Sequence, residues 1–445
     1  MTNLPTFPAE PAWAAFAAID WGSQTHSWAL LPGNADSVEA GKLDNTPEAV
    51  ELWAGALRSR FPQGPIALAL EQKRGAVVYM LSKYDHLVLF PVPPSMSASY
   101  RKAFYPSGAK TDPADAALLL DLIVHHRERL RPRAVDTPET RLLQFLVEQR
   151  RQLVQEKVRW VQRLTDSLQQ YFPQIRTWFS DVGSPLVEAL LERWPTLNQL
   201  QRSHRGTLRR FFTAQNCRKQ ELVRQRIDAI YAAVPATTDA VVIEVCTRKT
   251  AACLRLIGEL RAQIGELDCR LAAVTANHPD RPIFDSFPGA GAATVPRLIA
   301  IFGTCRETWP SAAAVQQFSG IAPVHKSSGN STLVVMRRAC PKFVRQTFHE
   351  FAGQSIQWSA WAKAYYRHQR DDLKKGHHHA VRALAFRWIR ILYRCWKDRQ
   401  PYDERLFLES QRRRNALVGS NSPAQTPLRW DTAGGFKKLT AAPIR

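Results

Sequence analysis

The chain has 445 residues, which is enough for two to four domains and excludes a single small module. It carries 61 Lys and Arg against 39 Asp and Glu, a net charge of +22, but 45% of its residues are hydrophobic, which excludes a disordered polycation. The positive surplus is concentrated in residues 323–445, where 24 Lys or Arg face 8 Asp or Glu, a net charge of +16. This last quarter is the first candidate for binding a polyanion.

The cysteines and the N-terminus indicate a compartment. The seven cysteines are scattered without a CxxC pair, so we expect neither a disulfide framework nor a zinc knuckle. The first twenty residues have no basic segment, and no stretch approaches the about 18 uncharged apolar residues of a membrane span. We therefore expect a cytoplasmic protein, associated with the nucleoid, without a signal peptide or a membrane contact.

Residues 1–130 predict an α/β domain. Three strands, a helix, and then alternating strands and helices are expected at 13–20, 26–32, 38–44, 46–61, 65–71, from 75, from 87, and at 112–126. Strands followed by alternating strands and helices favour a mixed sheet covered by helices.

Residues 131–280 predict a long helical arm with a less regular insert over 172–237. Apart from Pro138, residues 137–171 contain neither Gly nor Pro, and apolar residues recur near heptad spacing in this segment and again after residue 256, as in a coiled coil. The seam residues are Leu143, Leu146, Leu153, Trp160, Leu164, Tyr171, Ile257, Leu260, Ile264, Leu267, Leu271 and Val274. The two seams either pack against each other or form a dimer contact.

Residues 281–415 predict a third, mainly helical region, and residues 416–445 a flexible tail rich in small and polar residues. Cations and aromatics interleave at helical spacing between residues 358 and 397. We expect the aromatics to be buried and the arginines to bind nucleic acid phosphates. The candidate arginines are Arg337, Arg338, Arg382, Arg387, Arg390 and Arg394. His377, His378 and His379 fall in an expected break of the helices, where consecutive side chains diverge, so RNA or phosphate contact, or no specific role, is preferred over a metal site.

Four carboxylates form the first candidate site. Asp20 and Glu71 each end a predicted strand, and Asp112 and Asp115 stand i, i+3 at the start of a helix. If the first and fourth strands are neighbours, the first pair projects together, and the second pair shares one helix face. Four oxygen ligands suit one or two Mg²⁺ (or Mn²⁺) ions. Each acid alone is more often structural, and Asp112 before Pro113 is also a good helix cap.

A second candidate site follows a Gly-rich turn. PGAGAATVPRLIA, with Gly289 and Gly291, predicts a turn that opens a helix, which can bind a phosphate or simply permit tight packing. In HKSSGNST, Ser327 and Ser328 stand beside Lys326 in a basic setting, and a hydroxyl there could attack a phosphodiester if it were activated. From the residues alone, this segment is more often an ordinary Ser/Gly loop.

The motifs AIDWGSQTHSWAL, ALEQKRGAVVYML, AKTDPADAALL, FPGAGAATVPRLIAIFG and FSGIAPVHKSSGNS together resemble the DEDD-type insertion-sequence transposases, the bridge-RNA-guided recombinases, whose N-terminal half is like the Holliday-junction resolvase RuvC. The most specific piece is KTDxxDA, with Lys110 before the third acid. The resemblance implies an α/β plus α architecture: an RNase H-like (RuvC-like) mixed-sheet domain, a long helical coiled-coil arm, and a C-terminal mainly helical transposase domain.

The resemblance also implies roles. Asp20, Glu71, Asp112 and Asp115 would bind metal, and Ser328, with Ser327 as the fallback, would form a covalent phosphoserine link to DNA. The implied partners are donor and target DNA, a structured guide RNA, and further copies of the chain in a dimer or tetramer. Two alternatives stay open: a metal-only junction resolvase in which Ser328 merely binds phosphate, and a catalytically inactive nucleic-acid-binding protein.

Overall fold

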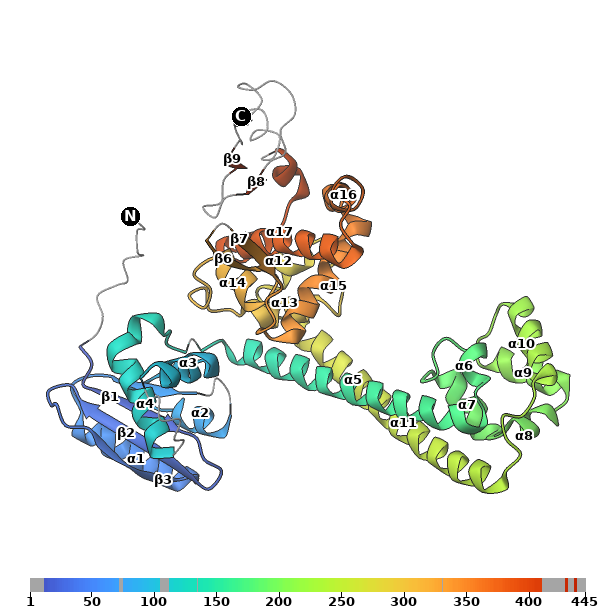
Figure 1. The fold of residues 1–445 in the computed structure, drawn as a ribbon, viewed down its shortest axis with the longest axis horizontal. Coiled ribbons are helices and arrows are strands. Elements are labelled where there is room, and N and C mark those ends of the chain that lie inside the picture. The colour runs from blue at the N-terminus through green and yellow to red at the C-terminus, as the bar shows by residue number, and fades with distance from the viewer. Residues whose placement is uncertain are drawn as a thin grey trace. The chain divides into compact units, whose positions relative to one another are not determined.

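The computed structural model describes residues 12–71, 75–104, 112–133, 135–329 and 331–409, apart from the side chains of Asp112 and Thr332, and the backbone of residues 429–430 and 436–437 (Figure 1). The chain divides into two units, Met1–Val135 and Asp136–Arg445, and each is described by itself.

The first unit is a mixed sheet with helices. Its elements are β1 (Ala15–Asp20), β2 (Thr25–Pro32), β3 (Glu39–Asp44), α1 (Pro47–Arg60), β4 (Ile66–Leu70), α2 (Ala76–Leu81), β5 (Leu87–Pro91), α3 (Pro94–Phe104), α4 (Asp112–His126) and the 3-10 turn η1 (Arg127–Arg129). The five strands lie in the order β3-β2-β1-β4-β5. β2 is antiparallel to β1 and β3, whereas β4 is parallel to β1 and β5. This confirms the predicted α/β class, and it makes the first and fourth strands neighbours, the condition under which Asp20 and Glu71 were expected to project together.

Alternating residues of the central strands supply two cores. On one face, β1 and β4 contribute residues such as Ile19, Ile66 and Leu68, which pack against α1 and α2. On the other face, the central strands contribute mainly small residues, among them Ala18 and Ala69, and α4 packs there through its leucines. Because alanines leave room for a close approach, α4 can lie directly on β1 and β2.

The second unit begins with a helix of 34 residues, α5 (Pro138–Tyr171), which pairs with a helix of 37 residues, α11 (Ala240–Ala276) (Figure 1). The pair is antiparallel, since the start of α5 lies by the residues that follow α11 and its end lies by the first turns of α11: Thr140 contacts His278, and Ser167 contacts Thr250. Residues of the two predicted seams share cores within one chain, Leu143 with Leu271 and Leu164 with Ile257. Dimerisation through the seams stays a prediction.

The expected irregular insert is helical. It contains α6 (Ile175–Trp178), α7 (Pro185–Arg193), α8 (Leu197–Gln201), α9 (Arg205–Ala214) and α10 (Gln220–Ala232). These helices build a core with the far end of the long pair, around Phe172, Phe212 and Leu254. They are short because prolines and polar caps interrupt the chain, as at α8, where Thr196 and Gln199 form a capping box. Such short segments carry too little periodicity to be predicted.

The remaining helices form a bundle on the other end of the long pair. They are α12 (Arg281–Asp285), α13 (Val295–Phe302), α14 (Ala312–Phe318), α15 (Lys342–Trp358), α16 (Ala360–Arg367), the π-helical η2 (His368–Asp372) and α17 (His377–Asp398), with the strands β6 (Val324–Ser328), β7 (Ser331–Val335), β8 (Arg429–Trp430) and β9 (Phe436–Lys437). Leu143 and Leu271 of the long pair share one hydrophobic core with Trp388 and Trp396 of α17.

Two local expectations were wrong. The Ser/Gly segment is not an open loop but an antiparallel hairpin of β6 and β7, with Gly329 at a positive φ of 54° in its turn. The histidine tract does not lie in the break but forms the first turn of α17, because the chain turns at Lys374, which also has a positive φ, and Gly376 caps the helix. His377 there contacts the Tyr366 hydroxyl at 2.7 Å.

Candidate active site and nucleic-acid interface

The first two acids lie side by side in the sheet. Asp20 is the last residue of β1, and Glu71 directly follows β4. The two strands are parallel and Ile19 pairs with Leu70, so Asp20 and Glu71 occupy successive positions at the same edge. Both side chains are half-buried. The predicted juxtaposition of these two carboxylates is thus a consequence of strand order and register.

The loop after Asp20 is anchored by a buried histidine. The backbone N–H of Gly22 donates a hydrogen bond to Nδ1 of His26 at 3.2 Å. The side-chain amide of Asn45 donates a hydrogen bond to the Ser23 carbonyl at 3.1 Å. His26 is fully buried, and burial lowers its pKa, so Nδ1 stays free to accept. These contacts fix the chain on leaving β1 and thereby position Asp20.

The other two acids begin α4, the helix that packs on β1. Asp112 is its first residue, and its side chain lies outside the described part of the structure. Asp115, one turn later, is only 7% exposed. A carboxylate so far removed from water requires a compensating partner.

That partner comes from α3 and was not predicted. Arg101 donates to a carboxylate oxygen of Asp115, and the hydroxyl of Ser97 donates to Glu71. Ser97 and Arg101 stand i, i+4 and therefore share one face of α3. Their only signal in the sequence is this spacing, shortly before the acids of α4, and such a spacing is too common to identify a site.

The acids suit a divalent ion by their chemistry. They supply only hard carboxylate oxygens, which Mg²⁺ prefers, and one of them is buried. Within the described residues, which lack the Asp112 side chain, no three His, Cys, Asp or Glu side chains are gathered closely enough to hold a metal. Arg101 provides the positive charge next to Asp115, so a metal that binds Asp115 would compete with this guanidinium.

Ser328 lies at the end of β6, where it pairs with Ser331 across the hairpin. Ser327 and Ser328 are both exposed. Because side chains alternate along a strand, Lys326 and Ser328 share one face of the hairpin and Ser327 points to the other face. The two candidate nucleophiles therefore differ in their surroundings, and only Ser328 has the lysine on its side.

The two glycines of the Gly-rich turn also differ. Gly289 has a positive φ of 81°, and a side chain there would come within 3.0 Å of the backbone of α15 at Gln354 and Ser355. A side chain at Gly291 would meet no atom within 4 Å. Gly289 thus permits tight packing, and only Gly291 leaves its surroundings open to a ligand.

The predicted C-terminal cations have diverse contacts. Arg382 is half-buried and donates to the carbonyls of Gly320 and Ile321, and burial lowers its pKa. Arg387 stacks over the Tyr365 ring at 4.4 Å, and Arg394 pairs with Asp398. Arg338 and Arg390 are exposed, Arg337 is half-buried, and Lys110 lies outside the described residues.

The aromatic residues of α17 are in the core, as expected. Trp388 and Trp396 are fully buried, and their indole N–H groups donate to the Ser355 hydroxyl and the Gly303 carbonyl at 2.8 and 2.7 Å. Trp358 at the end of α15 is different, since it is 70% exposed. This tryptophan is an exposed aromatic side chain in the basic region that could stack on a base.

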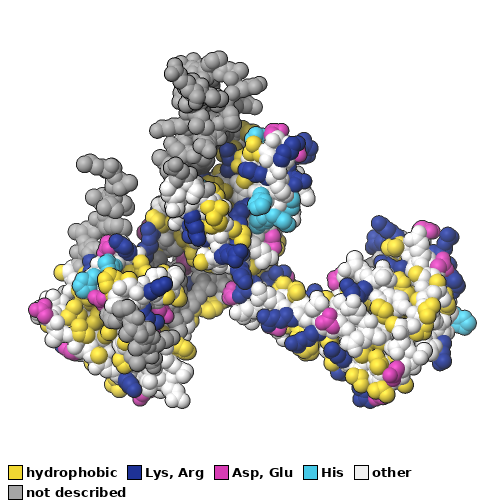
Figure 2. All heavy atoms as spheres, viewed as in Figure 1, with side chains coloured by type: hydrophobic (Ala, Val, Ile, Leu, Met, Phe, Trp, Pro, Cys, Tyr) yellow, Lys and Arg dark blue, Asp and Glu magenta, His cyan; other side chains and the backbone are white. Residues whose placement is uncertain are grey.

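The insert carries a basic surface that the charge excess of the last quarter of the chain did not indicate. Figure 2 shows Lys and Arg side chains spread over the helices α6 to α10. Within the described residues, several of these exposed cations have no acidic partner: Arg193, Arg202, Arg209, Arg210, Arg218 and Lys219. Arg193 and Arg210 line one open hollow, together with Thr207 and Gln215.

The chain thus combines a mixed-sheet domain with carboxylates at the ends of its central strands and a basic helical unit with an exposed serine. Both parts match known protein families. Residues 17–173 match the DEDD transposase domain of the IS110 type, and residues 281–367 match the transposases of the IS116/IS110/IS902 family.

Individual relatives extend the likeness over most of the chain. The IS117 mini-circle protein of Streptomyces coelicolor is 24% identical over 412 residues, covering 89% of this chain and 97% of that protein. The 43.6 kDa protein of insertion element IS110 from the same organism is 27% identical over 399 residues, covering 88% of this chain and 96% of its own length. The 44.8 kDa protein of insertion element IS116 from Streptomyces clavuligerus is 25% identical over 319 residues, covering 69% of this chain and 76% of that protein.

The chain belongs to the IS110-type DEDD transposases of insertion sequences. It is a transposase, and the family implies DNA as its substrate and suggests the use of a divalent metal. None of the described helices is both long and apolar enough to cross a membrane.

Proposed function

We propose that this transposase cuts and rejoins DNA through a covalent phosphoserine intermediate, with Asp20, Glu71, Asp112 and Asp115 as metal-binding acids and Ser328 as nucleophile. The observation that carries the proposal is the adjacent placement of Asp20 and Glu71 at the ends of parallel neighbours, below a helix that begins with the other two acids. An exposed serine that shares its face with a lysine completes the set.

The four acids, together with Ser97 and Arg101 of α3, could bind the phosphate of a phosphodiester. A divalent ion held by the carboxylates would neutralise the charge of the phosphate oxygens. Arg101 would have to exchange its carboxylate partner as that ion is bound, and it is then available to donate to a phosphate oxygen itself. Ser97 holds Glu71 by a hydrogen bond and so orients this carboxylate.

In the proposed serine step, one bond to phosphorus forms and one bond to phosphorus breaks. The Oγ of Ser328 bonds to phosphorus and gives up its proton, the bond from phosphorus to one deoxyribose oxygen breaks, and that oxygen takes up a proton and leaves as a hydroxyl, so no net proton is gained or lost. Lys326 on the same face attracts the phosphate. When the hydroxyl of another strand attacks the phosphoserine, the serine is regenerated and a phosphodiester is restored, so no nucleotide cofactor is required.

The proposal includes a guide RNA and oligomerisation. A net charge of +16 over residues 323–445 and the unpaired cations of the insert support binding to more nucleic acid than one active site requires. Exposed apolar side chains on the long helix pair, including Val241 and Leu256, support a dimer contact. RNA that copurifies with the full chain and is released by ribonuclease, together with its mass in solution, tests both points.

We also propose a functional division into residues 1–130 for the acids in an RNase H-like (RuvC-like) domain, 131–280 for the arm, 281–415 for the serine, and 416–445 for a tail. A change of unit at residue 136 supports the first boundary. The second boundary separates roles rather than folding units, because Leu143 and Leu271 share the core of the C-terminal helices.

The decisive experiment measures recombination and the covalent link together. In cells that supply the native flanking DNA, junction PCR detects the excised circle, and in vitro the full chain is incubated with DNA of the element ends and separated under denaturing conditions. We expect wild type to give circles and a protein–DNA adduct. Ser328→Ala should lose both, Asp20→Ala should lose both, and the matched control Ser327→Ala should keep both.

The outcomes separate the alternatives. If Ser328→Ala keeps its circles while Asp20→Ala loses them, the reaction is metal-only cleavage or the nucleophile is Ser327, and the double variant distinguishes these two. If Asp20→Ala keeps its circles, the acids are structural. Both results contradict the proposed mechanism.

A further inference from the structure

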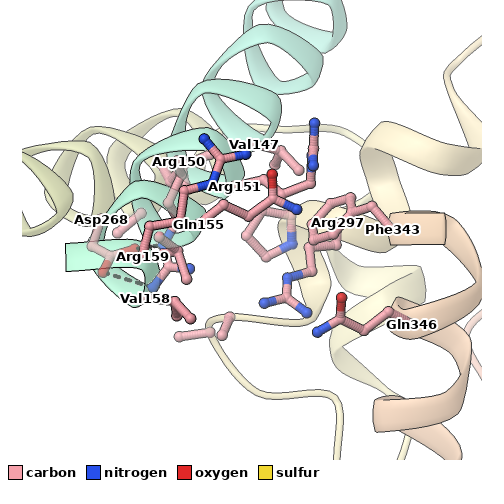
Figure 3. A pocket seen from close by; sticks show the side chains of 16 residues that line it. Val147, Arg150, Arg151, Gln155, Val158, Arg159, Asp268, Arg297, Phe343 and Gln346 are labelled. Carbon is pink, nitrogen blue, oxygen red and sulfur yellow. Dashed lines mark hydrogen bonds and ion pairs between the residues drawn. The ribbon is translucent and has the colours of Figure 1, made fainter. Parts of the chain in front are cut away.

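A hollow of about 660 Å³ lies where the root of the long helix pair meets the C-terminal bundle (Figure 3). Its volume is within the range of roughly 300 to 1,000 Å³ that small-molecule sites occupy. The walls come from α5, from α11, from the Gly-rich turn before α13, and from α15. All the residues that line this hollow belong to the second unit, and none of them is part of the serine hairpin.

The hollow combines an apolar wall with hydrogen-bonding groups. Valines of α5, Leu271 and the alanines of the Gly-rich turn form the apolar part. Figure 3 shows Gln155 with the arginines of α5 on one side, and Arg297 with Gln346 on the other. A planar ligand with apolar faces and a polar rim would satisfy both kinds of surface.

Two of the arginines lie over the same aromatic ring. The guanidinium groups of Arg151 and Arg297 lie 5.7 and 5.1 Å from the centre of the Phe343 ring. Guanidinium planes that are restrained in this way are stacking surfaces for nucleobases. The ring thus positions two arginines without using their hydrogen-bond donors.

Each arginine has an acidic partner that leaves donors available. Arg297 gives one amino group to Glu350 at 2.5 Å, while Arg150 and Arg151 bind Asp268 and Glu148 through Nε and one amino group each. In the part of the chain that the structure describes, at least one amino group of each arginine remains without an acceptor. Gln346 donates to Glu350 at 2.6 Å, which leaves its Oε1 as an acceptor.

The charge balance identifies the ligand class. The three acidic partners, Asp268, Glu148 and Glu350, offset the charges of Arg150, Arg151 and Arg297. The hollow should therefore bind a bare phosphate weakly, but it suits a group that both accepts and donates hydrogen bonds. An apolar peptide would bury three incompletely satisfied guanidinium groups, which is costly. At the rim, Arg159 is 65% exposed and pairs only with the neighbouring Glu156, so it can exchange this partner for a backbone phosphate.

We propose that this hollow binds one unpaired nucleotide of a nucleic-acid strand, with its base inside against the apolar wall and the guanidinium planes and its phosphate at the rim. The proposal rests on the proposed function in so far as the chain must bind nucleic acid. It adds a binding site for an extruded base, and base contacts of this kind are sequence-tolerant when stacking dominates.

The test uses the full chain and single-stranded oligonucleotides that contain one 4-thiothymidine (DNA) or 4-thiouridine (RNA) for photocrosslinking, followed by peptide mapping. Ala272→Trp fills the hollow from α11 without removing a charge, and Ala273→Trp adds the same side chain at the next exposed position, outside the hollow. Gln155→Trp fills the hollow from α5 if the first variant fails to fold.

We expect crosslinks on peptides that contain residues 147–159, 292–297 or 343–346, and their loss in the filled variants but not in Ala273→Trp. Filling should weaken single-strand binding at least about fivefold, the low end of what one stacked base contributes, and leave binding to a fully paired duplex unchanged. The DNA and RNA arms show which strand supplies the base.

Three results overturn the proposal. They are crosslinks that map elsewhere, the absence of any crosslink from a strand that the chain binds, and equal weakening of single-strand binding by Ala272→Trp and Ala273→Trp. If the wild-type chain binds neither oligonucleotide nor duplex, the proposed function itself fails, which distinguishes that failure from a failure of the hollow alone.

Discussion

Replacing Arg101 with Gln should destabilise the N-terminal unit and make it more responsive to divalent metal. The side chains of Arg101 and Asp115 are 25% and 9% exposed. Removing one partner of a fully buried ion pair costs about 3–5 kcal/mol, because the other charge is left without compensation. Since water reaches Arg101 on one side, the cost expected here is lower, about 2 kcal/mol.

The assay is differential scanning calorimetry of the full chain in the presence of a chelator. For a unit of this size, 2 kcal/mol corresponds to a fall in Tm of about 8 °C. The matched control is Arg58→Gln, which breaks an ion pair to Asp85 whose side chains are 62% and 78% exposed. Loss of such a surface pair costs less than about 1 kcal/mol, so this variant should unfold close to the wild-type temperature.

Added Mg²⁺ then shows whether Arg101 stabilises the unit by its charge or only by its packing. Without Arg101 the carboxylates carry more uncompensated negative charge, so Mg²⁺ should bind more tightly and raise the Tm of Arg101→Gln more than that of wild type. A ligand at 100 times its Kd stabilises by about 2.7 kcal/mol, enough to restore the lost stability. An unchanged Tm in chelator, or an equal Mg²⁺ effect in both proteins, would refute the reasoning.

Three further predictions follow from burial and charge. Burial lowers the pKa of His278 below its ordinary value of 6.5, and its Nδ1 accepts the Asp280 amide at 3.1 Å. The stabilisation that comes from keeping His278 neutral in the folded chain is therefore fully present above about pH 6.5. It is lost as the pH falls toward the lowered pKa of the folded state, because the histidine of the unfolded chain takes up its proton at a higher pH. In urea unfolding at several pH values, the free energy of unfolding of His278→Gln should depend less on pH than that of wild type. An unchanged pH dependence would count against this role of His278. Trp388→Ala should cost about 3–5 kcal/mol in urea unfolding, whereas Trp358→Ala, at an exposed site, should cost less than about 0.5 kcal/mol; similar values would contradict the burial argument. Replacing Arg193 and Arg210 with Gln should reduce the salt slope of duplex DNA or RNA binding by about 2, and a slope equal to that of wild type would show that the insert does not contact phosphates.

The sequence was most informative where local pattern and register decide the structure. The strand order β3-β2-β1-β4-β5 follows from three successive strands and two crossovers, and it brings Asp20 next to Glu71 as expected. The two long helices were predictable because their apolar residues repeat over many turns. These features depend on periods of two and 3.5 residues, which a single sequence displays.

The rest of the candidate site depends on contacts between distant segments. Nothing in the chain around Ser97 and Arg101 indicates that α3 would lie over the acids, since their contacts join residues 14 and 26 positions apart. The hollow beside Phe343 likewise joins α5, α11 and α15. Such clusters arise from packing rather than from local propensity, so the pairing of a buried carboxylate could be expected but its partner could not be named.

A buried polar network explains how the arm and the serine-bearing bundle are held together. Arg306 makes two hydrogen bonds to Asp280, at 2.6 and 2.7 Å, and both residues are less than a tenth exposed. His278 binds Thr140 of α5 at 2.8 Å, while Asp136 accepts the amides of Thr304 and Cys305 at 2.7 and 3.0 Å. These bonds join the start of α5 and the residues that follow α11, which lie at the same end of the long helix pair, to the bundle. Breaking the pair of Arg306 and Asp280 would leave a buried charged group unpaired. The root of the arm is therefore rigid, and we expect any movement that the proposed role of Ser328 requires to occur in the exposed hairpin of β6 and β7 rather than at this root.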